Sequence, residues 1–239
     1  MKLVPVWSGK GGVGKSCVCA YTAAAMAATD KKTLLIDMGG GSGSLDAILG
    51  ARDYAVFHLG DVLSGECGPE KAIVPVEGHK DLFLLPAGAP PRGKAAAVSL
   101  QEVLEQVKDD YEFIFLDNPD FESLKPEQIR TALLVLTPDT LSVRGAAQKN
   151  LELFEAGIKR VRLVINHVPA SVVPMKSYQD FDGIIDITGA QLIAVIPSSR
   201  KLHHSANNGL PLNRESLTVQ IFERLAGRLL GKQLPLLVR

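Results

Sequence analysis

The feature that most constrains the fold is a glycine-rich segment, Gly9–Ser16, which reads GKGGVGKS. It matches the pattern G-x-x-x-x-G-K-[ST], in which a loop surrounds phosphate groups. The segment follows an apolar run at 2–7 and precedes a helical pattern that begins at Lys15. Strand, loop and helix in this order are the context that such a motif requires. The sequence therefore predicts a phosphate-binding loop.

The chemistry of this loop explains its composition. Glycines let successive backbone N–H groups turn toward the phosphates, and the helix N-terminus adds positive potential at the same point. We expect Lys15 to meet the β and γ phosphates and the Ser16 hydroxyl to bind Mg²⁺, so the expected cofactors are ATP and Mg. The predicted contacts to the nucleotide are Gly9, Lys10, Gly11, Gly12, Val13, Gly14, Lys15, Ser16 and Cys17. The alternative is a glycine-rich turn before an ordinary helix.

Short apolar runs alternate with helical patterns along the whole chain. The expected strands are 2–7, 33–36, 82–85, 113–116, 133–136, 163–165 and 192–196, and the clearest helices are 15–28, 100–108, 141–156 and 216–230. Several strands are continuously apolar, which is typical of strands covered on both faces. We therefore predict a doubly wound α/β fold, a mostly parallel sheet with helices on both faces, in a single domain over 1–239.

Pro5 conflicts with this pattern, because proline cannot donate a hydrogen bond within a sheet. Either a local bulge, or a strand whose regular pairing begins after Pro5, would reconcile it.

The charge balance argues against binding through bulk charge. Lysines and arginines number 26 and so do aspartates and glutamates. No net field attracts nucleic acid, and no nucleic acid partner is expected. The three cysteines fit neither a disulfide framework nor a metal site, and no signal peptide or ~18-residue apolar run is present. These features favour the cytoplasm.

The loop resembles a particular variant through its early lysine, Lys10, followed by Gly11-Gly12-Val13-Gly14-Lys15-Ser16. This is similar to the deviant phosphate loop of the MinD/ParA family of P-loop ATPases. The resemblance implies that Lys10 reaches across a nucleotide-dependent homodimer to the partner's nucleotide, so Lys10 and Lys15 are the expected catalytic residues. The alternative for Lys10 is a solvated loop lysine.

The resemblance continues over nearly the whole chain and is closest to the MinD branch, which places the bacterial division septum. The similar segments are 34–37 with 44–50, 111–119, 141–144, 164–166 and 194–197. It implies a partner of the septum-inhibitor or positioning type and a location that extends to the inner face of the membrane. Val219, Phe222 and Leu225 belong to an apolar stripe that would serve either as a membrane-surface helix or as the last core helix.

Four further residues are candidate ligands. Asp37 and Asp117 each follow an apolar strand, at the edge where α/β sheets bind ligands, so both are expected near Mg²⁺. The alternative for each is a cap on the following segment. Asn166 resembles the family's adenine reader, and Pro197 is expected to contact the nucleotide beside it; a turn-forming role for Asn166 stays open.

Two departures from the family concern hydrolysis. Gly39 stands where the family has a second carboxylate that orients the attacking water, and Phe121 follows Asp120 where a flexible glycine is usual. We expect an ATP hydrolase with slow or absent turnover. The alternative is a pseudo-ATPase scaffold for polar positioning or secretion-organelle assembly. A metallochaperone is disfavoured because Cys17 and Cys19 lie inside the first helix rather than in a loop.

Overall fold

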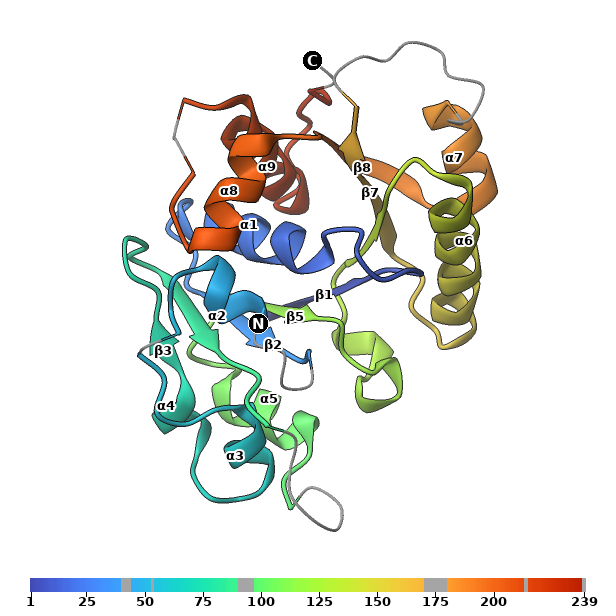
Figure 1. Ribbon diagram of the computed structural model, residues 1–239. Coiled ribbons are helices and arrows are strands. Elements are labelled where there is room, and N and C mark those ends of the chain that lie inside the picture. Colours follow the sequence, from blue (N-terminus) through green and yellow to red (C-terminus); the bar gives the residue numbers. More distant parts are fainter. Residues whose placement is uncertain (40–43, 53, 90–96, 170–179, 213–214, 238–239) are drawn as a thin grey trace.

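The structure is a computed structural model that describes residues 1–39, 44–52, 54–89, 97–169, 180–212 and 215–237 (Figure 1). Its strands form one sheet in the order β3-β4-β2-β5-β1-β6-β7-β8. All neighbouring strands are parallel except β3 and β4. The strands are β1 (Lys2–Trp7), β2 (Thr33–Asp37), β3 (Val74–Pro75), β4 (Leu82–Leu85), β5 (Phe113–Asp117), β6 (Ala132–Leu136), β7 (Val161–Val168) and β8 (Gln191–Pro197).

Helices cover both faces of this sheet (Figure 1). The α-helices are α1 (Lys15–Ala27), α2 (Ser44–Ile48), α3 (Leu59–Leu63), α4 (Pro69–Ala72), α5 (Leu100–Val107), α6 (Thr140–Glu155), α7 (Phe181–Thr188), α8 (Arg200–Asn208) and α9 (Leu217–Leu229). Short 3₁₀ turns occupy Phe121–Ser123 and Pro126–Gln128. The predicted doubly wound α/β fold is confirmed.

Alternating side chains of each strand enter two separate cores. In β1, Val4 and Val6 pack with α1, α2, α8 and α9, whereas Leu3 and Trp7 pack with α5, α6 and α7. Successive side chains of a strand point to opposite faces, so a strand buried on both faces has an unbroken apolar sequence. This explains the continuously apolar runs in the sequence.

Pro5 lies in the central strand, where proline is unusual. Its partner in β5 is Leu116, while regular pairing with β6 begins only at Val6. The N–H of Lys2 points toward β5, so by alternation the nitrogen of Pro5 faces β6, where no ladder bond is needed. The sequence left two explanations for a proline in this strand. The second one, regular pairing that begins after Pro5, is correct for the pairing of β1 with β6.

All seven predicted strands and the four clearest helices are present, with ends that differ by up to three residues. The short elements α2, α3, α4 and β3 were not predicted, because two to five residues carry no measurable periodicity. In α9, Phe222 and Leu225 are buried against α1 and β8, so the apolar stripe is a core-packing one. Within the described ranges, no helix is long and apolar enough to cross a bilayer.

Candidate functional site

The phosphate loop leaves the carboxyl end of β1, between the ends of β5 and β6. Asp117 at the end of β5 is in register with both Val6 of β1 and Asp37 of β2. The loop and the two predicted metal-binding carboxylates therefore meet at one edge of the sheet. In open α/β sheets, this edge is where ligands bind.

The loop geometry leaves open space where phosphates are expected. Gly12 and Gly14 have φ of 78° and 81°, which side chains rarely adopt. A Cβ added at Gly11 or Gly12 would meet nothing within 4 Å among the described atoms. At Gly14, which caps α1, no side chain caps the helix, and the first turn of α1 contains no acidic residue. Uncapped backbone N–H groups at a helix start attract an anion, so this loop fits a phosphate group.

Gly9 is a glycine for a different reason. A Cβ at this position would lie 2.0 Å from the carbonyl carbon of Gly145 in α6, and a Cβ at Gly145 would lie 2.7 Å from the Gly9 oxygen. The backbones of the loop and of α6 therefore touch. This close approach positions the start of the loop on α6.

Lys15 and Asp117 form an ion pair across the base of the site. Nζ of Lys15 lies 2.8 Å from Oδ1 of Asp117, and the two side chains are 17% and 1% exposed. A carboxylate this deeply buried requires a charged or hydrogen-bonded partner. The lysine predicted to meet phosphates and the aspartate predicted to lie near Mg²⁺ thus neutralise each other in the protein without ligand.

Asp37 caps the segment that follows β2. Its Oδ1 accepts a hydrogen bond from the N–H of Gly39 at 2.8 Å, and its Oδ2 accepts from the N–H groups of Ser44 at 3.2 Å and Leu45 at 3.1 Å. Burial raises the pKa of Asp37, and the backbone hydrogen bonds only partly offset that effect. Oδ2 therefore caps the start of α2, the capping role left open by the sequence, while Oδ1 holds the backbone just after β2.

The start of α2 also reaches the phosphate loop. The hydroxyl of Ser44 lies 3.3 Å from the hydroxyl of Ser16. Asp37, Ser44 and Ser16 are therefore connected through hydrogen bonds, so a ligand that engages the Ser16 hydroxyl competes with this contact. Residues 40–43, which lie between the two similar segments 34–37 and 44–50, are outside the described residues.

Asn166 supports the loop from β7. Its Nδ2 donates to the carbonyl of Val13 at 2.8 Å, and the side chain is 2% exposed. Its Oδ1 is buried without a hydrogen-bond partner in the described part of the chain. Nδ2 also lies 2.4 Å from the position of a Cβ at Gly14, which requires glycine there. Pro197 ends β8 opposite Val168, on the same side of the sheet.

A stacked histidine pair next to Asn166 was not predicted. The rings of His167 and His203 lie 4.9 Å apart and 12° from parallel. The pKa of His167 is lowered by burial and by the neighbouring His203. His203 and His204 are exposed, as expected, but only the structure brings His203 against the residue after Asn166. The left-handed backbone of His167, with φ of 56°, leaves no local signal in the sequence.

Lys10 is exposed and pairs within its own chain. Its Nζ lies 3.4 Å from Oδ1 of Asp139, and the two side chains are 45% and 41% exposed. Asp139 also caps α6 by accepting from the N–H of Ser142. An exposed pair of this kind contributes little to stability, so Lys10 is available to another partner.

The segment after β5 is held on both sides. The N–H of Asn118 donates to Val6, and Nε1 of Trp7 donates to the carbonyl of Pro119 at 2.7 Å. Beyond it, the ring of Phe121 lies under the ammonium group of Lys149 on α6, 5.5 Å away. Phe121 is thus packed where the sequence lacks the flexible glycine.

Cys17 lies half-buried in the first turn of α1, next to the loop residues as expected for a nucleotide contact through its backbone. Burial and then the charge of Asp117 raise the pKa of its thiol to about 11, so the thiol stays protonated. Cys19 is fully buried. Among the described residues, no group of three or more His, Cys, Asp or Glu side chains could hold a metal ion.

A glycine-rich phosphate loop between the central strand and the first helix of a doubly wound sheet defines a P-loop nucleotide-binding protein. The chain matches the family described as CobQ/CobB/MinD/ParA nucleotide binding domain over residues 4–212, and it belongs to that family.

Relatives within the family are similar in sequence to this chain over nearly its full length. The chain is 35% identical to the septum site-determining protein MinD of Synechocystis sp., covering 99% of this chain and 92% of the relative. It is 30% identical to the protein of the same name from Thermotoga maritima, covering 98% and 90%. The resemblance to the MinD/ParA family is confirmed.

Solved structures of MinD have the same fold. The MinD chain of the MinC:MinD cell division protein complex of Aquifex aeolicus superposes with a TM-score of 0.87 at 29% identity, covering 100% of this chain and 99% of that one. MinD of Pyrococcus horikoshii, complexed with Mg-ADP, superposes with a TM-score of 0.80 at 26% identity, covering 95% of each chain.

Proposed function

We propose that this protein is a switch that dimerises on binding Mg-ATP and that takes part in placing the division septum. The observation that carries the proposal is the meeting of Lys15, Ser16 and Asp117 at the uncapped start of α1. The names of the MinD relatives support the cell process. The scaffold alternative is not favoured, because those relatives are septum site-determining proteins.

The first step of the proposal is binding of the triphosphate. The N–H groups of the loop would donate hydrogen bonds to the phosphate oxygens, and the Lys15 ammonium would exchange Asp117 for the β and γ phosphates. The Ser16 hydroxyl, released from Ser44, and Asp117, through a hydrogen bond from a metal-bound water, would hold Mg²⁺. Bound Mg²⁺ supplies positive charge that stabilises the phosphoryl group during transfer.

The second step concerns the movement of α2. Because Asp37 caps α2 and Ser44 contacts Ser16, loss of the Ser16–Ser44 contact frees the start of α2 from the loop. We propose that Asp37 acts on the metal site indirectly, by holding the start of α2 next to Ser16. Asn166 and Pro197 lie on the side of the loop toward β7 and β8, where the adenine would bind.

The third step is dimerisation. Lys10 is exposed and held only by an exposed carboxylate, so it is free to reach the nucleotide of a second subunit. A relative from Aquifex aeolicus has been solved in complex with MinC. We propose that the dimer of this protein binds a septum inhibitor of the same kind, at the inner face of the membrane.

Hydrolysis is expected to be slow. Gly39 has no side chain and donates its backbone N–H to Asp37, so this position has no carboxylate to orient water. Phosphoryl transfer depends mainly on positioning and charge stabilisation, so loss of one positioned group slows turnover more than it weakens binding.

Light scattering with ADP, with ATP and with a nonhydrolysable ATP analogue tests the switch. We expect a monomer with ADP and a dimer with ATP or the analogue. A monomer under all three conditions would contradict the proposal.

A further inference from the structure

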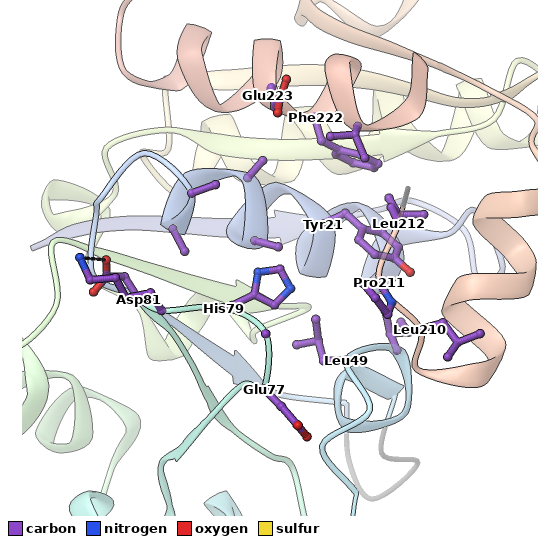
Figure 2. A pocket seen from close by; sticks show the side chains of 18 of the residues that line it. Tyr21, Leu49, Glu77, His79, Asp81, Leu210, Pro211, Leu212, Phe222 and Glu223 are labelled. Carbon is purple, nitrogen blue, oxygen red and sulfur yellow. Dashed lines mark ion pairs between the residues drawn. The ribbon is translucent and has the colours of Figure 1, made fainter. Parts of the chain in front are cut away.

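A cavity of about 560 Å³ lies at the end of α1 that is remote from the phosphate loop (Figure 2). It is enclosed by α1 from Tyr21 onward, the end of α2, the turn 77–81 before β4, the segment 209–212 after α8, and α9. Tyr21 is six residues beyond Lys15, which is ~9 Å along the helix axis. Cavities of roughly 300–1,000 Å³ are the size of small-molecule sites. The cavity is distinct from the nucleotide site.

The floor of the cavity is flat and apolar. Ala24, Ala25 and Ala28 of α1 face it with methyl groups only. The walls add Leu49 after α2 and Phe222 of α9, whose ring packs 5.6 Å from the ring of Tyr21. A planar or aliphatic group of a ligand would lie on this alanine floor and lose apolar surface to both walls.

Tyr21 places an unsatisfied polar atom at the cavity. The residue is 7% exposed, and its hydroxyl is buried without a hydrogen-bond partner among the described residues. In Figure 2 the hydroxyl lies on the side of Pro211. A buried hydroxyl without a partner costs free energy, and a ligand with a polar group next to its apolar part would satisfy it.

The rim of the cavity is acidic. Among the described residues it contains the carboxylates of Asp30, Glu77, Asp81 and Glu223 and one lysine, Lys80. Lys80 lies 3.8 Å from Asp30 and 3.8 Å from Asp81, so it partly neutralises these two. Glu77 accepts a hydrogen bond from the hydroxyl of Tyr54, and Glu223 forms no ion pair within the described ranges.

These charges select the sign of the ligand. The imidazole of His79 points into the cavity beside the acidic rim (Figure 2). A carboxylate or phosphate would approach Glu77 and Glu223 at an electrostatic cost, whereas an ammonium or guanidinium group would be attracted.

We propose that this cavity binds a small organic cation. Its apolar part lies on the alanine floor against Phe222, and its ammonium or guanidinium group faces Glu223, the next residue of α9.

The test compares three probes of related shape in protein-detected NMR titrations of the full chain with saturating ADP. The probes are 4-phenylbutylamine, 4-phenylbutanoate and butylamine. We expect the first to bind with shifts confined to Tyr21, α9 and the turn 77–81. The anion, which reverses the charge, and butylamine, which lacks the ring, should each bind about tenfold more weakly or not at all.

Variants assign the binding to the cavity. Ala25→Leu, which fills the floor, should weaken 4-phenylbutylamine about tenfold or more while ADP affinity is retained. Glu223→Gln, which removes the carboxylate next to Phe222, should weaken it about threefold. The control Asp186→Asn removes an exposed carboxylate from α7, outside the cavity. It should leave the affinity for 4-phenylbutylamine unchanged.

If Ala25→Leu does not fold, Tyr21→Phe serves in its place. We expect this variant to bind 4-phenylbutylamine about threefold more weakly. Absence of binding at about 10 mM amine, equal binding of the amine and the anion, or affinities unaffected by these variants would each overturn the proposal.

Discussion

The ammonium of Lys15 lies 2.8 Å from the buried carboxylate of Asp117, a residue more than a hundred positions away in the sequence. The pair joins the helix that starts at the phosphate loop to the strand next to the loop. Either partner alone would be a poorly solvated charge at the base of the site, so the pair stabilises the protein without ligand.

Lys15→Ala is expected to abolish ATP binding and to destabilise the protein without ligand. The substitution leaves Asp117 as an unpaired buried charge, which costs about 3 kcal/mol. Calorimetry and urea unfolding measure the two effects. The double variant Lys15→Ala/Asp117→Asn should recover much of the stability but none of the binding. Unchanged ATP affinity in Lys15→Ala would refute the assignment of the loop.

Lys10→Ala should weaken ATP-dependent dimerisation while the monomer keeps its affinity for nucleotide, because among the described residues the Lys10 ammonium pairs with the exposed Asp139. Its loss should cost less than about 1 kcal/mol of stability. Lys31→Ala removes a comparably exposed ion pair, with Glu112, and is the control. Equal dimerisation of the two variants by light scattering would exclude a role for Lys10 across the interface.

Gly9→Ala and Gly11→Ala should have opposite effects. A methyl group at Gly9 meets the backbone of Gly145, and the resulting shift should cost about 1–3 kcal/mol of stability. At Gly11 the methyl group meets nothing, so stability should change by no more than about 0.5 kcal/mol, while ATP binding weakens if phosphates occupy that space. Thermal unfolding and calorimetry distinguish the two. A Gly11→Ala variant with unaltered ATP affinity would argue that the phosphates lie elsewhere.

Turnover of the wild-type protein should be below about 0.1 per second, because a typical enzyme runs near ~10 per second and a positioned catalytic group contributes ~10² or more. Gly39→Asp restores a carboxylate and should raise the rate of phosphate release about tenfold or more. No gain would point to Phe121, packed under Lys149, as a second limit on the switch. A fast wild-type enzyme would disprove the importance of Gly39.

Stability is expected to fall as the pH drops below about 6.5, through His167. The folded protein lowers the pKa of His167 by burial and by the nearby His203, so the unfolded chain takes up its proton at higher pH than the folded protein does. The contribution of neutral His167 to the free energy of unfolding is complete above pH 6.5. It is lost as the pH falls from 6.5 to the lower pKa that His167 has in the folded protein.

Urea unfolding at pH 7.5 and pH 5.5 measures this effect. His167→Asn, which tolerates the positive φ, should reduce the difference between the two pH values. The control His58→Asn, in α3's cap and away from the pair, should not reduce it. An equal pH dependence in wild type and His167→Asn would assign the effect to other groups.

The sequence by itself determined the phosphate loop, its flanking strand and helix, and the doubly wound sheet. These follow from contiguous residues: Gly9–Ser16 spells the motif, and runs such as 113–116 are apolar because both faces of the strand are buried. Asp37 and Asp117 were placed at the correct edge because the ends of parallel strands meet there.

Only the tertiary structure decided what those side chains contact. The sequence left open whether Asp37 caps the backbone, and the structure shows that it accepts hydrogen bonds from Gly39, Ser44 and Leu45. Lys10 meets a carboxylate 129 positions away, and the His167–His203 stack and the cavity at the end of α1 are assembled from separate elements. Local patterns determine which elements form, but contacts between distant elements depend on how the helices pack on the sheet, which no single segment encodes.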